Sequence, residues 1–255
     1  MNNITAIGFD LFNTLITVEP ETLVEATDRL IQSLRQSGFS IEEEPFKKVY
    51  REIALELIAR SKQDGRETHN SIWISATLEN FGQTVPPDDT KISEAVEHYF
   101  SAFYDNCQLI PGTATMLDAL KGRYSLGLLS NFTHGPAARE ILDRTGLEPY
   151  FETILISGEL GFRKPYPLVF EKLIKQLGTP KDQILYIGDD LDCDIYGAHA
   201  AGLRPVWTTY ARDNKSPVPT GMPKRDDREP GIDVPRISSW QDLAPLLETE
   251  DVINI

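Results

Sequence analysis

Polar residues that could do chemistry follow three short apolar segments, at the point where each segment ends. Asp10 follows residues 5–9, Ser130 and Asn131 follow residues 125–129, and Asp189 with Asp190 follow residues 184–187. Such segments are typical of buried strands, and in an open parallel sheet a ligand lies beyond the carboxyl ends of the strands. A single loop carboxylate or serine more often caps a helix, but three such coincidences in one sheet favour a binding or catalytic site.

The elements that must position these residues alternate along the second half of the chain. Strands are predicted over residues 125–129, 153–156, 184–187 and 206–208, and helices over 135–145, 168–177, 194–201 and 240–247. Alternating strands and helices imply right-handed crossovers and a parallel sheet covered on both faces. The isolated first strand, residues 5–9, belongs with them. We therefore expect an α/β fold with a Rossmann-like, doubly wound parallel sheet as its core.

A block of helical periodicity separates the first strand from the others. Apolar residues recur at helical spacing in four stretches between about residues 21 and 106. The pattern predicts an α-helical cap domain over residues 17–108, inserted into a core domain made of residues 1–16 and 109–255. Aromatic residues at helical spacing are usually core, so we expect Tyr99, Phe100, Phe103 and Tyr104 to be buried rather than to line a pocket.

Four short motifs occur in order at the ends of these predicted elements. They are Phe9-Asp10-Leu11-Phe12-Asn13-Thr14-Leu15, Leu129-Ser130-Asn131, Gly161-Phe162-Arg163-Lys164-Pro165, and Ile187-Gly188-Asp189-Asp190 followed by Asp194. The first resembles the D-x-D-x-T-L signature of the haloacid dehalogenase superfamily, and the others resemble its second, lysine and acidic motifs. One motif alone would be weak, but four at suitable strand ends make the resemblance specific. The insertion point is similar to that of the subfamily with a helical cap of the first type.

The resemblance implies a magnesium-dependent hydrolase that acts on a small phosphorylated metabolite through an aspartyl-phosphate intermediate. Asp10 would be the nucleophile and a metal ligand, and the Phe12 carbonyl, Asp189 and Asp194 would complete the protein ligands. Ser130, Asn131 and Lys164 would bind phosphate oxygens, with Lys164 also paired to Asp10. The charges agree with this assignment, because a carboxylate attacking a phosphate dianion needs nearby positive charge, and an oxygen-rich ligand set suits Mg²⁺.

The sequence departs from the family's phosphatases at Phe12. Those phosphatases carry a second aspartate there, which protonates the leaving group and then activates water. An aromatic ring transfers no proton, and the loss of a general acid/base lowers a rate about a hundred- to ten-thousand-fold. A phosphatase could still act slowly or on a good leaving group, with the proton supplied by the substrate or by a cap residue such as His69 or His98.

Two other activities fit an aromatic residue at position 12. The 2-haloacid dehalogenases of the superfamily also have one there and use no metal, but they replace the acidic pair by neutral residues, whereas this chain keeps Asp189. Without a cation, Asp189 would raise the pKa of Asp10 and weaken it as a nucleophile. The third alternative is a weakly active or inactive member that binds a phosphorylated ligand or a protein. We rank the phosphatase first.

The composition of the chain indicates what kind of protein it is and which partners it is expected to have. Of the 255 residues, 40% are hydrophobic and 25% charged, as in ordinary globular proteins. A formal net charge of −14 repels polyphosphate backbones, so no nucleic-acid partner is expected. Two distant cysteines indicate neither a zinc site nor a disulfide framework, and no membrane-spanning run or basic leader is seen. We expect a cytoplasmic protein without a membrane partner, and a long surface loop over residues 212–231.

Overall fold

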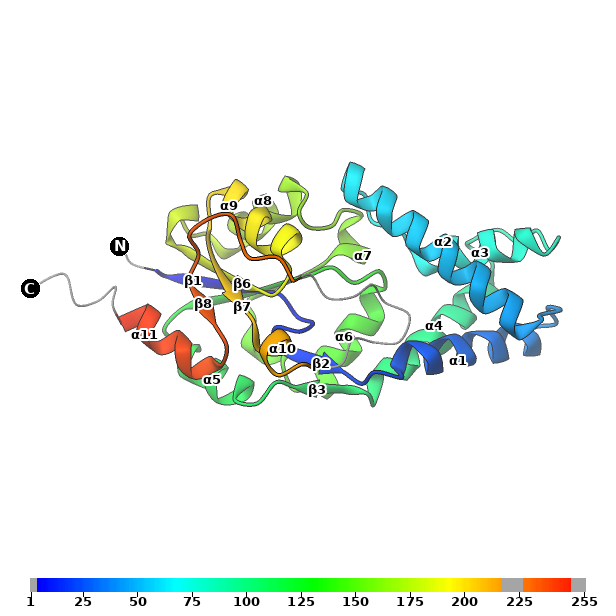
Figure 1. Ribbon diagram of the computed structural model, residues 1–255, viewed down its shortest axis with the longest axis horizontal. Helices are drawn as coiled ribbons and strands as arrows, with labels where there is room; N and C mark the ends of the chain where they lie inside the picture. The colour runs from blue at the N-terminus through cyan, green and yellow to red at the C-terminus, as the bar shows by residue number, and fades with distance from the viewer. Residues whose placement is uncertain (1–3, 217–226, 249–255) are drawn as a thin grey trace, which may run out of the picture.

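The computed structural model describes residues 4–216 and 227–248 (Figure 1). Its main sheet has the strand order β5-β4-β1-β6-β7-β8, and every neighbouring pair is parallel. The strands are β1 (Ala6–Phe9), β4 (Ser125–Ser130), β5 (Thr153–Ile156), β6 (Ile184–Gly188), β7 (Arg204–Thr208) and β8 (Arg236–Ile237). Phe9 is in register with Leu128 and Ile187. The residues that follow β1, β4 and β6 therefore meet at one edge, as predicted.

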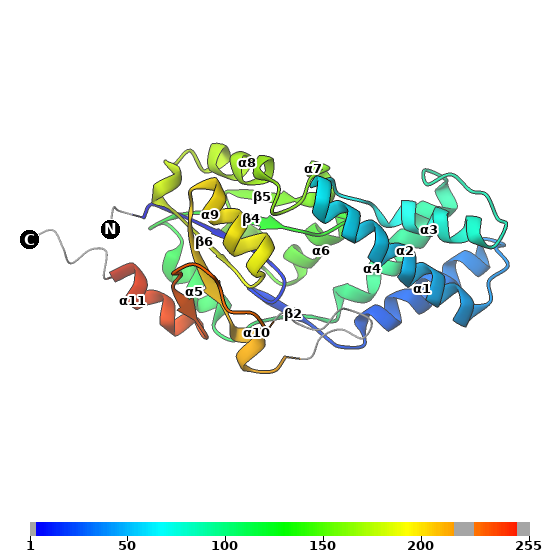
Figure 2. The same ribbon diagram turned by 45° about the horizontal axis from the view of Figure 1, so that its top comes forward.

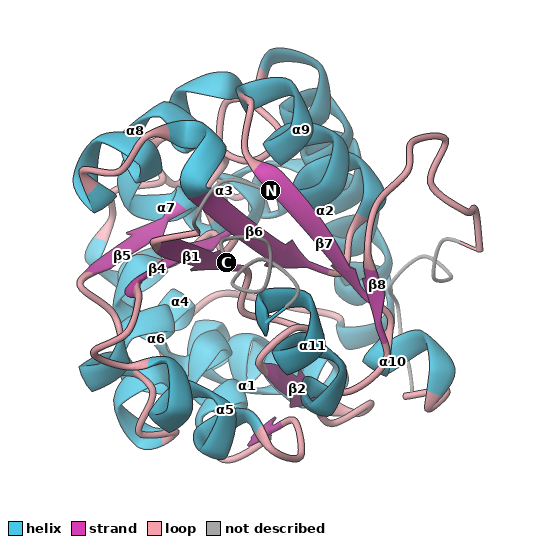
Figure 3. Cartoon of the chain, turned by 90° about the vertical axis from the view of Figure 1, so that its left-hand side faces the viewer, coloured by secondary structure: helices cyan, strands magenta, loops and turns pink. Residues whose placement is uncertain are grey.

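Helices cover both faces of the sheet (Figure 3). Successive strand residues point to opposite faces, so Ile7 and Phe9 pack into one apolar cluster and Ala6 into another. The first cluster includes residues of α5 (Thr113–Leu120), α6 (Gly135–Arg144) and α11 (Leu243–Glu248). The second includes residues of α8 (Pro167–Leu177) and α9 (Gly197–Ala201). The chain has the doubly wound α/β architecture that its sequence predicts.

Four helices form a lobe beside the sheet, which Figures 1 and 2 show at one end of the molecule. They are α1 (Thr22–Gln36), α2 (Glu43–Asp64), α3 (Asn70–Asn80) and α4 (Thr90–Tyr104). Helix α1 packs along α4, and α2 along α3. Tyr99, Phe100 and Phe103 are buried, as expected, and Tyr104 is partly buried. We call α1–α4 the helical lobe.

A two-stranded antiparallel ribbon joins the helical lobe to the sheet. Strand β2 (Ile16–Val18) pairs with β3 (Cys107–Leu109), which places Ile16 opposite Leu109 and Val18 opposite Cys107. Both passages of the chain between lobe and sheet run through this ribbon. The domain boundaries predicted from the sequence fall within it, but the pairing of β2 with β3 was not predicted.

Several shorter elements differ from the prediction or were not foreseen. The helix expected over residues 194–201 begins earlier, as a π-helical segment over Leu191–Tyr196 that continues into α9. The last helix begins as a 3-10 turn, Trp240–Asp242. Short helical elements not foreseen are Glu148–Tyr150, α7 (Ser157–Leu160), Lys181–Gln183 and α10 (Tyr210–Asp213). The last of these opens the loop expected over residues 212–231, whose residues 217–226 lie outside the described part.

Candidate active site

Asp10 is fixed in place by the strands on either side of it. Its backbone N–H donates a hydrogen bond to the Ile187 carbonyl at 2.9 Å, so the residue leaves β1 still attached to β6. Its Oδ2 accepts from the Thr14 hydroxyl at 3.4 Å, and its Oδ1 accepts from Lys164 Nζ at 2.6 Å. The residue is only 7% exposed. This carboxylate is therefore held at the sheet edge where a ligand of an open α/β fold binds.

Two further carboxylates converge on Asp10. One oxygen each of Asp10, Asp189 and Asp194 lie within 4.8 Å of one another. Asp189 directly follows β6, and Asp194 lies in the π-helical segment, where its Oδ2 accepts from the Asp190 backbone N–H at 3.0 Å. A Cβ atom at Gly188 would overlap the Asp194 carboxyl group, so the cluster needs glycine there. Asp190 is not part of the cluster, because its side chain caps the segment at the Cys193 N–H.

Lys164 is buried against this cluster. Its Nζ donates to Asp10 Oδ1 at 2.6 Å, to Asp194 Oδ1 at 2.7 Å and to the Tyr186 hydroxyl at 3.0 Å, and its side chain is 2% exposed. Tyr186 in turn donates to the Leu129 carbonyl at 3.0 Å. Tyr186 was not among the site residues predicted from the sequence. A signal was available, since a tyrosine inside an otherwise apolar strand usually finds a partner for its hydroxyl.

Among the described residues, the three carboxylates of Asp10, Asp189 and Asp194 have only one buried ammonium, that of Lys164, to balance their charge. Burial raises the pKa of Asp189 well above its usual value, and the charges of Asp10 and Asp194 add to this effect. Burial likewise raises the pKa of Asp194 to about 7, with Lys164 opposing the rise. Burial disfavours the charge of Lys164, but Asp10 and Asp194 outweigh it and raise its pKa well above the ordinary value. Were all three carboxylates ionised, the single ammonium would leave two negative charges uncompensated.

This arrangement fits a divalent cation. The donor set consists of carboxylate oxygens, which Mg²⁺ prefers over nitrogen or sulfur ligands. The uncompensated negative charge supplies the attraction. Asp10, Asp189 and Asp194 were all predicted as ligands, and the structure brings them together. The role predicted for the Phe12 carbonyl stays a prediction.

Ser130 and Asn131 lie at the end of β4, beside Asp10 in the sheet. The Ser130 hydroxyl is fully buried and is one of three buried side-chain polar atoms without a hydrogen-bond partner among the described residues. An unpaired buried hydroxyl is costly, so it is suited to a ligand oxygen. The Asn131 side chain is already engaged, since it donates to the Lys164 carbonyl at 3.0 Å and accepts from the Lys164 N–H at 2.8 Å. It holds the lysine loop in place, and its predicted contact with phosphate stays a prediction.

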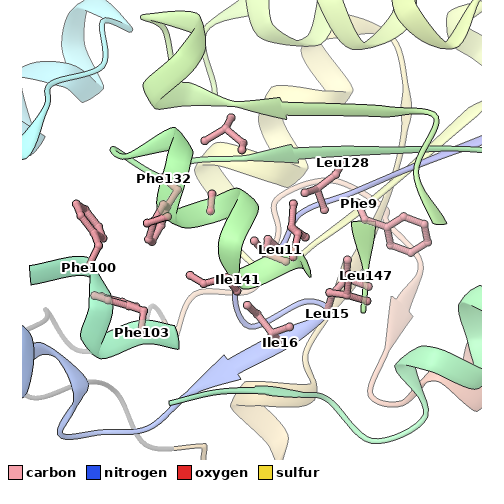
Figure 4. Packing of buried hydrophobic residues seen from close by; sticks show 14 of the residues in the cluster. Phe9, Leu11, Leu15, Ile16, Phe100, Phe103, Leu128, Phe132, Ile141 and Leu147 are labelled. Carbon is pink, nitrogen blue, oxygen red and sulfur yellow. The ribbon is translucent and has the colours of Figure 1, made fainter. Parts of the chain in front are cut away.

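Phe12 belongs to a cluster of four phenylalanine rings between sheet and lobe, which we call the aromatic cluster. Its ring stacks on Phe132, with centroids 5.1 Å apart and an interplanar angle of 15°. Phe132 also packs against Phe100 at 5.2 Å and Phe103 at 5.8 Å, both from α4. Figure 4 shows Phe100, Phe103 and Phe132 grouped at this junction. The position that carries an acid in the family's phosphatases is therefore part of a hydrocarbon surface.

His69, a proposed proton donor, is tied into a chain of hydrogen bonds beside the aromatic cluster. The Ser71 N–H donates to His69 Nδ1 at 3.2 Å, which leaves the His69 proton on Nε2, 3.1 Å from His134 Nδ1. His134 then carries its proton on Nε2 and donates to Glu97 at 2.8 Å. Burial lowers the pKa of His69, and His134 lowers it further. His98, the other proposed donor, is exposed on α4.

A contact that the sequence did not predict joins the helical lobe to the lysine motif. The α2–α3 loop and the loop before Lys164 exchange two backbone hydrogen bonds, from Glu67 N–H to the Gly161 carbonyl at 3.0 Å and from Arg163 N–H to the Gly65 carbonyl at 2.9 Å. The Glu67 side chain is 3% exposed and pairs with Arg163 at 3.2 Å. It also accepts from the Ser157 hydroxyl. We call this the Glu67–Arg163 contact.

Comparison with known proteins places the chain in a family. Residues 4–202 match the family model described as haloacid dehalogenase-like hydrolase. The chain belongs to this family. It is 31% identical to the pyrimidine 5'-nucleotidase PynA of Streptococcus pneumoniae over 208 residues, which cover 78% of the chain and 81% of the relative. It is 29% identical to a glyceraldehyde 3-phosphate phosphatase of Pyrococcus abyssi over 212 residues, which cover 82% and 83%.

Solved structures agree on the fold. A 2-haloacid dehalogenase from Pseudomonas syringae pv. Tomato DC3000 superimposes with a TM-score of 0.68 at 23% identity, covering 96% of this chain and 99% of that one. At this identity the likeness concerns the fold alone. This hydrolase family thus includes relatives named as phosphatases and nucleotidases, as the motifs predicted. In the described part of the chain, no helix has the length and apolarity needed to cross a membrane.

Proposed function

We propose that the chain is a Mg²⁺-dependent phosphatase in which Asp10 attacks the phosphorus atom of a small phosphorylated metabolite. The observation that carries this proposal is the group of three carboxylates with the ammonium of Lys164 among them. Such a group is tolerable only with further positive charge, and phosphoryl transfer needs that charge at the same place. The named activities of the relatives from Streptococcus and Pyrococcus support the same chemistry.

The roles of the individual residues follow from their contacts. Asp189, Asp194 and Asp10, with the Phe12 carbonyl, would hold Mg²⁺, which supplies charge neutralisation when it is bound. Lys164 pairs with Asp10, orients its carboxylate and would bind a phosphoryl oxygen. Ser130 would donate its unused hydroxyl proton to another oxygen. Asp10 then forms a bond to phosphorus as the bond to the leaving group breaks, and water later hydrolyses the aspartyl phosphate. Residues 17–108 would cap the site.

The test is turnover of an aryl phosphate by the purified protein. We expect activity that requires Mg²⁺ and disappears with EDTA and in Asp10→Asn. Asp192→Asn is the matched control, because Asp192 is an exposed aspartate of the neighbouring π-helical segment paired with Arg228. It should retain full activity. Turnover by Asp10→Asn at the wild-type rate would exclude Asp10 as the nucleophile.

Phe12 favours a second candidate function, hydrolysis of a carbon–halogen bond in a 2-haloacid. The carboxylate cluster opposes it, because Asp189 and Asp194 beside Asp10 would weaken a nucleophile that works without a cation. Release of chloride from 2-chloropropionate in the presence of EDTA would establish this function. A protein that turns over neither substrate, yet shows a thermal shift with phosphorylated metabolites, would be a binding member of the family.

A further inference from the structure

The segment that follows Asp10 carries an aromatic ring at the position where the family's phosphatases have a proton donor. Phe12 stands at the position that protonates the leaving group in the family's phosphatases, and its ring stacks on Phe132. Phe100 and Phe103 of α4 close over Phe132 from the lobe (Figure 4). None of these four side chains has an exchangeable proton. A leaving group bound here would meet the planar faces and edges of aromatic rings.

The ionisable groups next to the aromatic cluster do not replace the missing acid. His134 stacks on Phe100 at 4.8 Å, and each ring nitrogen of His134 and His69 has a hydrogen-bond partner. The proton positions inferred from these bonds leave neither imidazole with an unused N–H. Glu97 of α4 is the last member of this series of hydrogen bonds, and its carboxylate accepts from His134. Among the described residues, these groups are occupied by one another rather than directed at a substrate.

We infer that the substrates are phosphoryl compounds whose departing oxygen is weakly basic and conjugated: acyl, enol or aryl phosphates. This inference rests on the proposed function and narrows it. In the first step an Asp10 oxygen forms a bond to phosphorus, the bond from phosphorus to the leaving oxygen breaks, and that oxygen keeps the electron pair. A carboxylate, enolate or phenolate leaves without a proton. An alkyl phosphate would have to release a strongly basic alkoxide, for which Phe12 offers no proton.

The second step lacks the same group, because the residue that protonates the leaving group also activates water in the family's phosphatases. Water adds to the aspartyl phosphate, the bond between phosphorus and the Asp10 oxygen breaks, and dihydrogen phosphate leaves. One proton of the water stays on the incoming oxygen and the other moves to a phosphoryl oxygen. Since Phe12 takes up no proton, this step is slow relative to the first. The phosphorylated protein therefore accumulates during turnover.

The first experiment uses the wild-type chain and a series of substituted phenyl phosphates, with acetyl phosphate and glycerol 1-phosphate added. We expect kcat/KM to fall steeply as the leaving-group pKa rises, with glycerol phosphate about a hundred-fold or more below the best aryl substrate. Rapid mixing should give a burst of phenolate equal to the enzyme concentration, and intact mass should show one added phosphoryl group. Turnover that is independent of leaving-group pKa would overturn the inference and leave the proposed function standing. No turnover and no phosphorylated protein with any of these compounds would overturn both.

The second experiment places a proton donor at position 12. Phe12→Asp should raise kcat/KM for glycerol phosphate about a hundred-fold or more over its matched control, Phe12→Asn, and abolish the burst. The two side chains have the same size, so the loss of ring stacking is common to both. Equal rates in both variants would show that the ring at position 12 is not what restricts the leaving group. Circular dichroism checks their folding, and the wild-type series tests the inference if neither variant folds.

Discussion

Lys164 depends on neighbours that come from four separate segments of the chain. Asp10 and Asp194 neutralise its ammonium, Tyr186 accepts its third hydrogen bond, and Asn131 holds its backbone on both sides. A buried charge is stable only with such partners, and loss of one partner leaves the others unpaired. The position of the amine is therefore set by residues that need not touch a substrate.

Asn131→Ala should displace Lys164 without removing any charge. The substitution deletes two hydrogen bonds to the lysine backbone, each worth about 0.5–1.5 kcal/mol. We expect kcat/KM for an aryl phosphate to fall about ten- to a hundred-fold, which corresponds to about 1.4–2.7 kcal/mol of transition-state stabilisation. Asn131→Asp keeps the acceptor for the Lys164 N–H but sets a carboxylate oxygen against the Lys164 carbonyl, so it should not restore the wild-type rate. Wild-type kinetics in the alanine variant would show that the backbone clamp is dispensable.

At the scale of elements, the loop between α2 and α3 fastens the helical lobe to the segment that carries Lys164. Gly65 ends α2 with a φ of 73°, and a Cβ there would collide with the Tyr166 ring. Glycine is thus required both for the turn and for the close approach. Glu67 then enters the core and meets Arg163, the residue before Lys164. Movement of the lobe would break this pair and two backbone hydrogen bonds together.

Glu67→Gln tests how much the Glu67–Arg163 contact contributes to the stability of the fold. Glutamine keeps the size of the side chain but removes the charge that Arg163 faces at 3.2 Å. Because hydrogen bonds to charged groups contribute about 1.5–3 kcal/mol, we expect the free energy of unfolding in urea to fall by about 1–3 kcal/mol. The control is Glu79→Gln, at an exposed position on α3, which should change the free energy of unfolding little. Equal stability of the two variants would contradict a structural role for the Glu67–Arg163 contact.

Elements defined by local periodicity could be predicted from the sequence, and contacts between distant segments could not. The strands that end at Asp10, Ser130 and Asp189 were predicted because short apolar segments ended at polar residues, and parallel pairing then brought those residues together. The ribbon of β2 and β3 was missed, since three-residue strands so far apart carry no local pattern. Glu67 and His134 were missed for the same reason. Each looks like an ordinary polar residue until its partner is known.

At the scale of the whole molecule, the carboxylate cluster adds buried acidic groups to a chain that is acidic overall. With a formal charge of −14, the protein already attracts cations. Asp194 has its pKa raised to about 7 by burial, against an ordinary value of 3.8. Between these values the unfolded chain has lost the proton and the folded chain keeps it. The stability of the metal-free protein therefore falls as pH rises from about 4 to about 7.

Added Mg²⁺ should reverse this trend, because the cation takes the place of the retained proton. We expect Mg²⁺ to raise the melting temperature more at about pH 8 than at about pH 5. At a Mg²⁺ concentration a hundred-fold above Kd, binding should raise the free energy of unfolding by about 2.7 kcal/mol. Scanning calorimetry in EDTA and in Mg²⁺ measures the shift at both pH values. Asp189→Asn should lose most of it and Asp192→Asn should keep it. A shift of equal size at both pH values would show that the cation displaces no proton.

The central position of β1 has a consequence for synthesis. This strand is translated before its sheet neighbours β4 and β6, which begin only at Ser125 and Ile184. Its apolar residues Ile7 and Phe9 therefore leave the ribosome without strands to pair with, in the state that chaperones bind. A nascent chain that stops before Asp194 lacks part of the carboxylate cluster, so the cation cannot stabilise it until that residue has emerged.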